Sequence, residues 1–183
     1  SKGIDQPCEF PAADYSQINY GSIVYSKTAV VFDYLKNYLG TETFDKAMQT
    51  YFETWKFKHP QSKDLRKIIE DVSGKNLSWF FDDLIGSTKK LDYKILSSKK
   101  SHCAENLSGD CREITIKNKG RIASPVIIST LKDGKVVSSQ WTEGFKGKKK
   151  INITTSDFDQ VRIDPGLYMP EINRNNNTLK RKG

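Results

Sequence analysis

Histidine is nearly absent from this sequence, and its scarcity limits the chemistry that the chain can perform. Among 183 residues there are two histidines, His59 and His102. No cysteine or carboxylate cluster accompanies either one at the spacing of metal ligands, so the chain alone encodes no recognisable zinc site. No serine or cysteine nucleophile has a histidine base, and no glycine-rich loop leads from a strand into a helix to hold a phosphate. We therefore expect these residues alone to bind no metal or cofactor.

Long apolar runs are also missing. No stretch approaches the roughly 18 apolar residues that cross a bilayer, and the first ten residues, "SKGIDQPCEF", lack the apolar centre of a signal peptide. We expect no membrane span in this chain. Its hydrophobic content of 36% is nevertheless enough to bury a core, in one large or two small domains.

Cysteine is scarce as well, with three residues in the chain. Cys103 and Cys111 flank the loop "AENLSGD", which a disulfide could span, whereas Cys8 is left over. A bridged pair would imply an oxidising compartment, and therefore a periplasmic or secreted protein. Reduced thiols in a cytoplasmic protein are the alternative, and the sequence leaves both open.

The net charge of +8 raises the question of a nucleic-acid partner. Residues 1–90 hold 12 basic and 12 acidic side chains, whereas residues 91–183 hold 18 and 10, so all the excess lies in the second half. Much of it is in "FKGKKK" (residues 145–150) and "TLKRKG" (residues 178–183), which lack the interleaved aromatic residues of a single-strand binder. Solvated charge is the better interpretation, and we expect no nucleic-acid partner.

Helical periodicity dominates the first 90 residues. Helices are expected at about residues 22–39, from Thr41 or Thr43 to Trp55, from a capping Ser62 to Gly74, and at residues 76–86. Each has apolar side chains at spacings of three and four, which predicts one buried face per helix. The first buried face is expected to consist of Val24, Ala29, Val31, Phe32, Leu35 and Leu39, and the second of Phe44, Ala47, Met48, Tyr51, Phe52 and Trp55.

From Leu91 onward the pattern changes to short alternating segments. Six strands are expected, and Asp133-Gly134 supplies the residues of a tight hairpin turn. The fold class is therefore α+β, with an all-α helical bundle over residues 1–90 and an immunoglobulin-like β-sandwich over residues 91–165. Residues 166–183 form a polar C-terminal tail that we expect not to pack.

An ordered set of residues between Tyr25 and Tyr93 resembles the C-terminal part of the catalytic domain of the aminopeptidase N family, the gluzincin zinc aminopeptidases. The set begins with Tyr25-x-Lys27 and continues through Leu39-Gly40, Phe44, Tyr51, Asp64-Leu65, Ser73-Gly74, Leu77, Trp79-Phe80-Phe81 and Leu91-Asp92-Tyr93. Residues 161–181 are similar, more weakly, to the β-sandwich that follows this domain in bacterial members of the family. The resemblance rests on the order and spacing of the set, since no single element is specific.

The resemblance implies that the chain is a fragment of a zinc-dependent aminopeptidase. In the family a His-Glu-x-x-His helix and a distant glutamate bind zinc upstream of this segment, so zinc would serve the intact parent, with a peptide as substrate. Tyr25 matches the family tyrosine, whose phenol donates a hydrogen bond to the oxyanion formed when zinc-bound water attacks the scissile carbonyl. Tyr25 is thus the one catalytic candidate. Lys27 is expected to be ordinary helix decoration, and Thr28 stands where many relatives have glycine.

Two functional classes follow. The first is a piece of an aminopeptidase that depends on an N-terminal catalytic half of the same protein and is inactive alone. The second is a stand-alone binding module whose sandwich face, made basic by Lys146 and by residues 148–150, docks an acidic partner.

Overall fold

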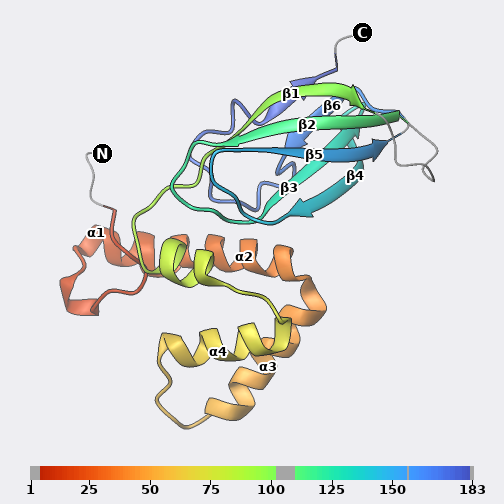
Figure 1. The fold of residues 1–183 in the computed structure, drawn as a ribbon. Helices are drawn as coiled ribbons and strands as arrows, with labels where there is room; N and C mark the ends of the chain where they lie inside the picture. Colours follow the sequence, from red (N-terminus) through yellow and green to blue (C-terminus); the bar gives the residue numbers. More distant parts are fainter. Residues whose placement is uncertain (1–4, 102–109, 156, 182–183) are drawn as a thin grey trace. The chain divides into compact units, whose positions relative to one another are not determined.

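The computed structural model describes residues 5–101, 110–155 and 157–181. The chain divides into two compact units, Ser1–Lys89 and Lys90–Gly183, the first helical and the second made of strands (Figure 1). The fold is α+β, a helical segment followed by a β-sandwich. No helix of the described part of the chain is long and apolar enough to cross a membrane.

The helical unit begins with a short 3-10 turn, Ala12–Asp14, and a single long helical run. This run starts as α1 (Gln17–Asn19), widens into the π-helix η2 (Tyr20–Lys27) and continues as α2 (Thr28–Leu39). It begins about five residues before the expected start because the Ser16 hydroxyl caps it by accepting from the Asn19 N–H.

The buried face of the run differs from the expected one. Its fully or nearly buried hydrophobic residues are Ile23, Val31, Tyr34, Leu35 and Tyr38, whereas Ala29 is exposed. The two tyrosines pack their rings against Trp79, with centroid distances of 5.1 and 5.8 Å. A fully buried apolar side chain such as that of Leu35 contributes roughly 1.5–3 kcal/mol to the free energy of folding.

Helix α3 (Thr41–Trp55) follows α2 after a single linking residue, Gly40, whose φ of +82° favours glycine. Neither threonine caps α3, because Gly40 occupies the N-cap position and Thr41 is already helical. The expected buried face is also wrong in part, since Ala47 alone is buried and Phe52 is 63% exposed.

Helices α4 (Ser62–Ser73) and η3 (Trp79–Ile85, again a π-helix) complete the unit. Gln61, not Ser62, is the N-cap of α4, and its N–H donates to the Asp64 carboxylate at 2.8 Å. Arg66 of α4 bonds to Asp82 at 2.8 Å and to Ser78 at 2.9 Å, which ties α4 to η3. Trp79, Phe80 and Phe81 are buried, as expected for core residues.

The second unit is a sandwich of two antiparallel sheets. One sheet has the order β1-β2-β5, with strands Tyr93–Ser101, Asp110–Asn118 and Lys148–Thr155. The other has the order β4-β3-β6-β7, with strands Lys135–Thr142, Val126–Lys132, Gln160–Ile163 and Thr178–Lys180. This arrangement of strands is immunoglobulin-like. The hairpin between β3 and β4 turns at Asp133 and Gly134, both at positive φ, as the sequence predicted.

The C-terminal segment differs from its expectation. Met169 is completely buried, and β7 pairs with β6 as a seventh strand. The Glu171 carboxylate accepts from the Tyr93 N–H at 2.6 Å and also contacts the Asn177 amide. Burial raises the pKa of Glu171 to about 7. The polar side chains of this segment pack because they satisfy backbone groups at the sandwich edge.

The cysteines fall into two groups. Cys8 is a free thiol, whereas Cys111 is disulfide-bonded. Cys103, its expected partner, lies outside the described residues, as does His102.

Candidate functional site

Tyr25 lies within the π-helical part of the long run. The backbone N–H of Thr28 bonds to the Ile23 carbonyl, five residues back, as well as to the carbonyl of Tyr25. The Thr28 hydroxyl also donates to the Ile23 carbonyl, at 3.1 Å. Thr28 therefore supports the wide turn from both its backbone and its side chain. Such π-helical turns are rare and occur frequently at functional sites.

The π conformation determines which way Tyr25 points. Residues five apart in an α-helix differ by about 140° in direction, since each residue turns by about 100°. In a π-helix the i and i+5 residues are joined by a hydrogen bond and share a side. Tyr20 and Tyr25 accordingly pack edge to face, with centroids 6.0 Å apart.

The same packing continues away from the helix. Tyr20 contacts Tyr15 at 6.1 Å, and Tyr15 contacts Phe10 at 5.5 Å, each edge to face. Such pairs are worth about 0.5–1.5 kcal/mol beyond their buried area. We call Phe10, Tyr15, Tyr20 and Tyr25 the aromatic series. The first three rings restrict the orientation of the Tyr25 ring from one side.

The hydroxyl end of Tyr25 is open. The side chain is 64% exposed, and its phenol has no hydrogen-bond partner in the described part of the chain. A phenol can donate one hydrogen bond. The Tyr25 hydroxyl is therefore an oriented hydrogen-bond donor that is open to a group outside the described residues.

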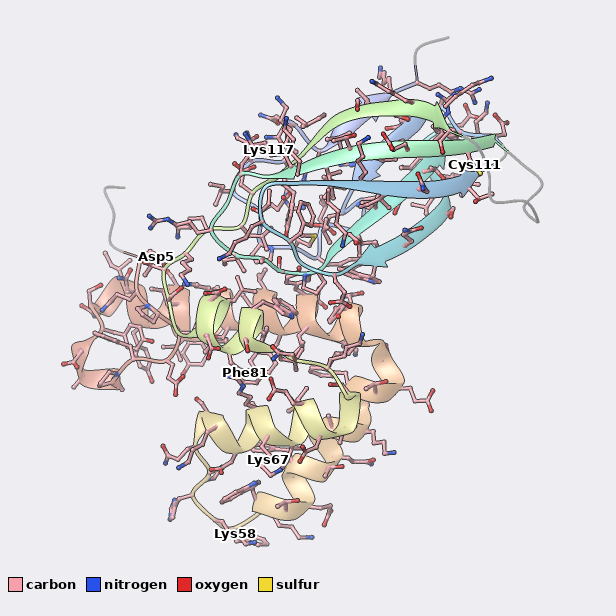
Figure 2. The ribbon with its side chains drawn as sticks, in the orientation of Figure 1. Asp5, Lys58, Lys67, Phe81, Cys111 and Lys117 are labelled. Carbon is pink, nitrogen blue, oxygen red and sulfur yellow. The ribbon has the colours of Figure 1, made fainter. Side chains whose placement is uncertain are left out.

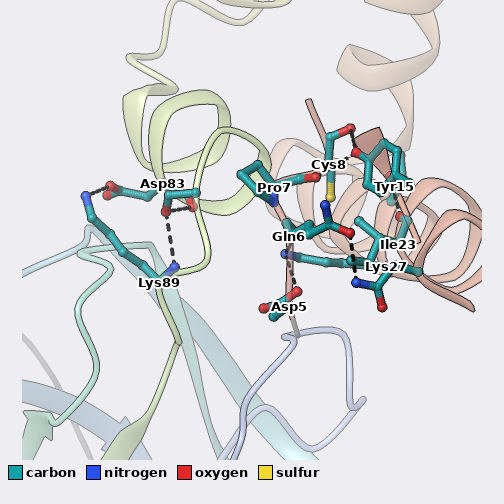
Figure 3. A network of polar contacts seen from close by, with 12 residues as sticks. Asp5, Gln6, Pro7, Cys8, Tyr15, Ile23, Lys27, Asp83 and Lys89 are labelled. Atoms are coloured by element: carbon teal, nitrogen blue, oxygen red, sulfur yellow. Dashed lines mark hydrogen bonds and ion pairs between the residues drawn. The ribbon is translucent and has the colours of Figure 1, made fainter. Parts of the chain in front are cut away.

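The N-terminal segment holds the π-helix in place (Figure 3). Lys27 forms an ion pair with Asp5 at 3.3 Å and donates to the Gln6 carbonyl at 3.1 Å. The Gln6 side chain in turn accepts from the Asn19 amide at 2.8 Å. Lys27 is therefore a half-buried link between two segments, and its expected role as outward decoration is wrong.

Tyr15 ties the same segment down. Its hydroxyl lies 2.7 Å from the Pro7 carbonyl and 2.8 Å from that of Cys8, and the Cys8 N–H donates to the Ile85 carbonyl at 2.8 Å. Burial raises the pKa of Tyr15, with the nearby Cys8 adding to the effect. Tyr15 is thus a structural donor, in contrast to the free phenol of Tyr25.

A cavity of about 190 Å³ lies nearby in the helical unit. Its walls are mostly apolar, and Tyr25 is not among them; they include Cys8, Thr28, Phe32, Leu65, Phe81 and Ile85. The lining also includes Glu9 and Ser62, but among the described residues no hydrogen bond joins their side chains to the Cys8 thiol, and we assign the cavity no chemistry.

A zinc ion does not fit the residues present. Among the described residues there is no group of three or more histidine, cysteine, aspartate or glutamate side chains that could hold a metal ion. His59 lies in an exposed turn after α3. The one candidate that the structure places in a defined setting is Tyr25.

Comparison with known proteins gives a family signal for the helical unit. Residues 3–84 match the peptidase family M1 domain. Over 108 residues the chain is 31% identical to aminopeptidase M1-C of Oryza sativa subsp. japonica, which covers 57% of this chain and 12% of that protein. Over 161 residues it is 25% identical to tricorn protease-interacting factor F2 of Thermoplasma acidophilum, which covers 86% of this chain and 20% of that protein.

A solved structure extends the likeness to the fold. A crystal structure of Legionella pneumophila aminopeptidase A in complex with aspartic acid matches with a TM-score of 0.61 at 16% sequence identity. The match covers 76% of this chain and 16% of that one. The chain spans a fifth or less of the length of each of these three relatives.

Proposed function

We propose that the chain belongs to peptidase family M1, of whose members it spans a part, and that it is a piece of an aminopeptidase that removes N-terminal residues from peptides. Within it, Tyr25 is the residue that acts in catalysis. The observation that carries this role is the exposed, unpartnered phenol on a π-helical turn. The sandwich has a structural role.

The chemistry proposed for Tyr25 is hydrogen bonding to an oxyanion. When the scissile carbonyl of a peptide is attacked, negative charge develops on its oxygen, and a positioned phenol O–H stabilises that charge. The interaction is stronger in the transition state than in the ground state, so it lowers the barrier. One donor of this kind is typically worth about 3–4 kcal/mol.

The rest of the machinery belongs to the intact parent. We propose that zinc and its ligands are supplied by an N-terminal catalytic half of the same protein, since the described residues do not fit a metal site. We also propose that the parent protein is bacterial, because residues 161–181 resemble the β-sandwich of bacterial members of the family.

The test of Tyr25 uses the longer protein of which this chain is a part. Turnover of an aminoacyl chromogenic substrate is compared between wild type, Tyr25→Phe and the matched control Tyr20→Phe, which removes a neighbouring hydroxyl from the aromatic series. We expect kcat of Tyr25→Phe to fall by roughly a hundredfold or more, with KM and metal content little changed. An unchanged kcat would show that Tyr25 is only a helix residue.

The chain alone gives a second test. The purified protein should hold no stoichiometric zinc, measured by elemental analysis, and should not hydrolyse the same substrate. One tightly held zinc per chain would contradict the proposal that the metal site lies in another part of the parent.

A binding module for an anionic partner is the second candidate function. The observation that favours it is a lysine-rich outer face on the β1-β2-β5 sheet. Of the lysines expected from the sequence to form a basic face, Lys149 lies over the Phe145 ring and Lys150 pairs with Glu113 at 3.1 Å, so neither presents a free charge. Retention on an immobilised acidic polypeptide should weaken as salt is raised, because salt screens exposed charges.

A further inference from the structure

Three lysines stand side by side across the β1-β2-β5 sheet. Lys94 of β1 is directly opposite Lys117 of β2, and Lys117 is directly opposite Lys148 of β5. All three are exposed, and Figure 2 labels Lys117 on β2. Residues directly opposite in an antiparallel pair have their Cβ atoms about 4.5–5.5 Å apart. We call these three residues the lysine row.

The rest of the outer face is also basic. Buried Ile114, Ile116, Ile151 and Ile153 define the inner face, so the residues that alternate with them point outward. Beyond the lysine row, the outward positions of the three strands are Ser97, Lys99, Ser101, Cys111, Glu113, Thr115, Lys150, Asn152 and Thr154. Five lysines and one glutamate give this face, the lysine face, a net charge of +4.

The lysine row is not needed by the fold. Like charges directly opposite each other in a sheet are destabilising. No residue of the row has an ion-pair partner among the described residues, whereas Lys150 is neutralised by Glu113. The row thus carries three uncompensated charges at a small cost to stability, and an external anion would remove that cost.

The composition of the face favours one kind of anion. Single-stranded nucleic acids need aromatic side chains on which bases stack, and the outward positions contain none. Protein interfaces are enriched in arginine and aromatic residues and depleted in lysine. Lysine on a sheet face suits a surface of diffuse negative charge, because its long stem lets the ammonium reach the headgroups. Leu96, at the bulge in β1, is a large apolar side chain that is 37% exposed.

We propose that the lysine face binds the surface of an anionic lipid bilayer, with the lysine row at one end of the face. The proposal rests on the second candidate function, binding of an anionic partner, and names that partner. It is independent of the role assigned to Tyr25. Binding is peripheral and electrostatic, so it should be reversible and lost as salt is raised.

The test is co-sedimentation of the full chain with vesicles of phosphatidylcholine containing 30% phosphatidylserine, and with pure phosphatidylcholine vesicles. We expect binding to the first and not to the second, with most of it lost at high salt. Replacing the row (Lys94→Gln, Lys117→Gln and Lys148→Gln together) should lower partitioning about 100-fold, since each lysine near such a surface contributes about 1 kcal/mol.

The matched control removes the same charge elsewhere, at Lys46→Gln, Lys63→Gln and Lys135→Gln, all of which are exposed and outside the lysine face. It should lower partitioning far less. Equal losses in the two triple variants would overturn the proposal, because net charge alone would then explain binding. Circular dichroism and hydrogen exchange on both variants establish that they are folded.

Immobilised polyglutamate distinguishes an acidic polypeptide partner from a lipid surface. Salt-sensitive retention on polyglutamate without binding to anionic vesicles would overturn the lipid proposal and leave an acidic polypeptide as the partner. Failure to bind either would overturn both the lipid proposal and the second candidate function. The kinetic test of Tyr25 is unaffected by any of these results.

Discussion

Reversing the charge of Lys117 should stabilise the sandwich. Lys117 is the middle residue of the lysine row and faces Lys94 on one side and Lys148 on the other. Lys117→Glu replaces two repulsive cross-strand pairs with two attractive ones. The substitution leaves the inner face untouched, because the side chain at this position points outward.

The size of the effect follows from the number of neighbours. An opposite-charge pair directly across a sheet contributes roughly 0.2–1 kcal/mol, and a like-charge pair is destabilising. Two pairs change sign, so we expect a gain of about 1–2 kcal/mol in the free energy of unfolding at low salt. Lys117→Gln removes only the repulsion and should give about half of that gain. At 1 M salt the Debye length is about 3 Å, so most of the difference should disappear.

The assay must read the sandwich separately from the helical unit, because a chain of two units need not unfold in one step. Hydrogen exchange followed by mass spectrometry does this through peptides from β1, β2 and β5. Slower exchange in these peptides, with unchanged exchange in α2 and α4, is the expected result. If Lys117→Glu exchanges as fast as wild type at low salt, the row carries no repulsion, and the physical basis for an anionic partner is lost.

Two further predictions concern the second unit and the cysteines. Because burial raises the pKa of Glu171 from 4.5 to about 7, the folded sandwich binds this proton more tightly than the unfolded chain does. The resulting stability is fully present below pH 4.5 and is lost as the pH approaches 7, so the free energy of unfolding should fall by on the order of 2–3 kcal/mol between pH 4.5 and pH 8. Glu171→Gln should flatten that profile in urea titrations, and an unchanged slope would show that Glu171 is not its source. Thiol titration of the denatured, unreduced protein should find one free thiol, Cys8, and three after reduction; three thiols before reduction would contradict the disulfide at Cys111.

The sequence predicted the kinds of element well and their details less well. Helical periodicity followed by alternation identified a helical segment and a β-sandwich, because both patterns reflect burial on one face. The buried face of the long helical run was misassigned for two reasons. An eight-residue π segment shifts the direction of the residues before α2, so that Ile23 is buried where Val24 was expected. Within α2, Tyr34 and Tyr38 are buried because they pack against Trp79, which is distant in sequence. No local sequence rule distinguishes a π turn from an α turn.

The C-terminal segment illustrates a second limit. Its asparagines and basic residues predicted an unpacked tail, yet Asn177 is 3% exposed and Met169 is buried. The burial is made possible by hydrogen bonds to residues distant in sequence, such as the one between Glu171 and Tyr93. Composition describes a segment by itself and contains no information about such partners.

The sequence indicated one residue of the candidate site, Tyr25, but not the contacts that hold this residue in place. Tyr25 was singled out by resemblance, but its support by Thr28 and the ion pair of Lys27 with Asp5 depend on three-dimensional contacts. The sequence predicted a basic face that included Lys148 but not Lys94 or Lys117, because the three residues lie on three strands and become neighbours only through the strand register. The signal that could have found the lysine row is a lysine next to a buried position in each of three alternating segments.

The two features to which we assign functions share a physical property: each is a place where stability alone would favour a different sequence. An exposed tyrosine on a π turn leaves its hydroxyl unused, and a row of like charges opposes the pairing of the strands that carry it. Consistency between local preference and fold is the rule in proteins, and departures from it concentrate at functional sites. A substitution that stabilises the row, such as Lys117→Glu, should therefore lower partitioning to anionic vesicles about 30-fold, since it removes two units of positive charge worth about 1 kcal/mol each. A variant that gained stability and still bound anionic vesicles as wild type does would break this link between local cost and function.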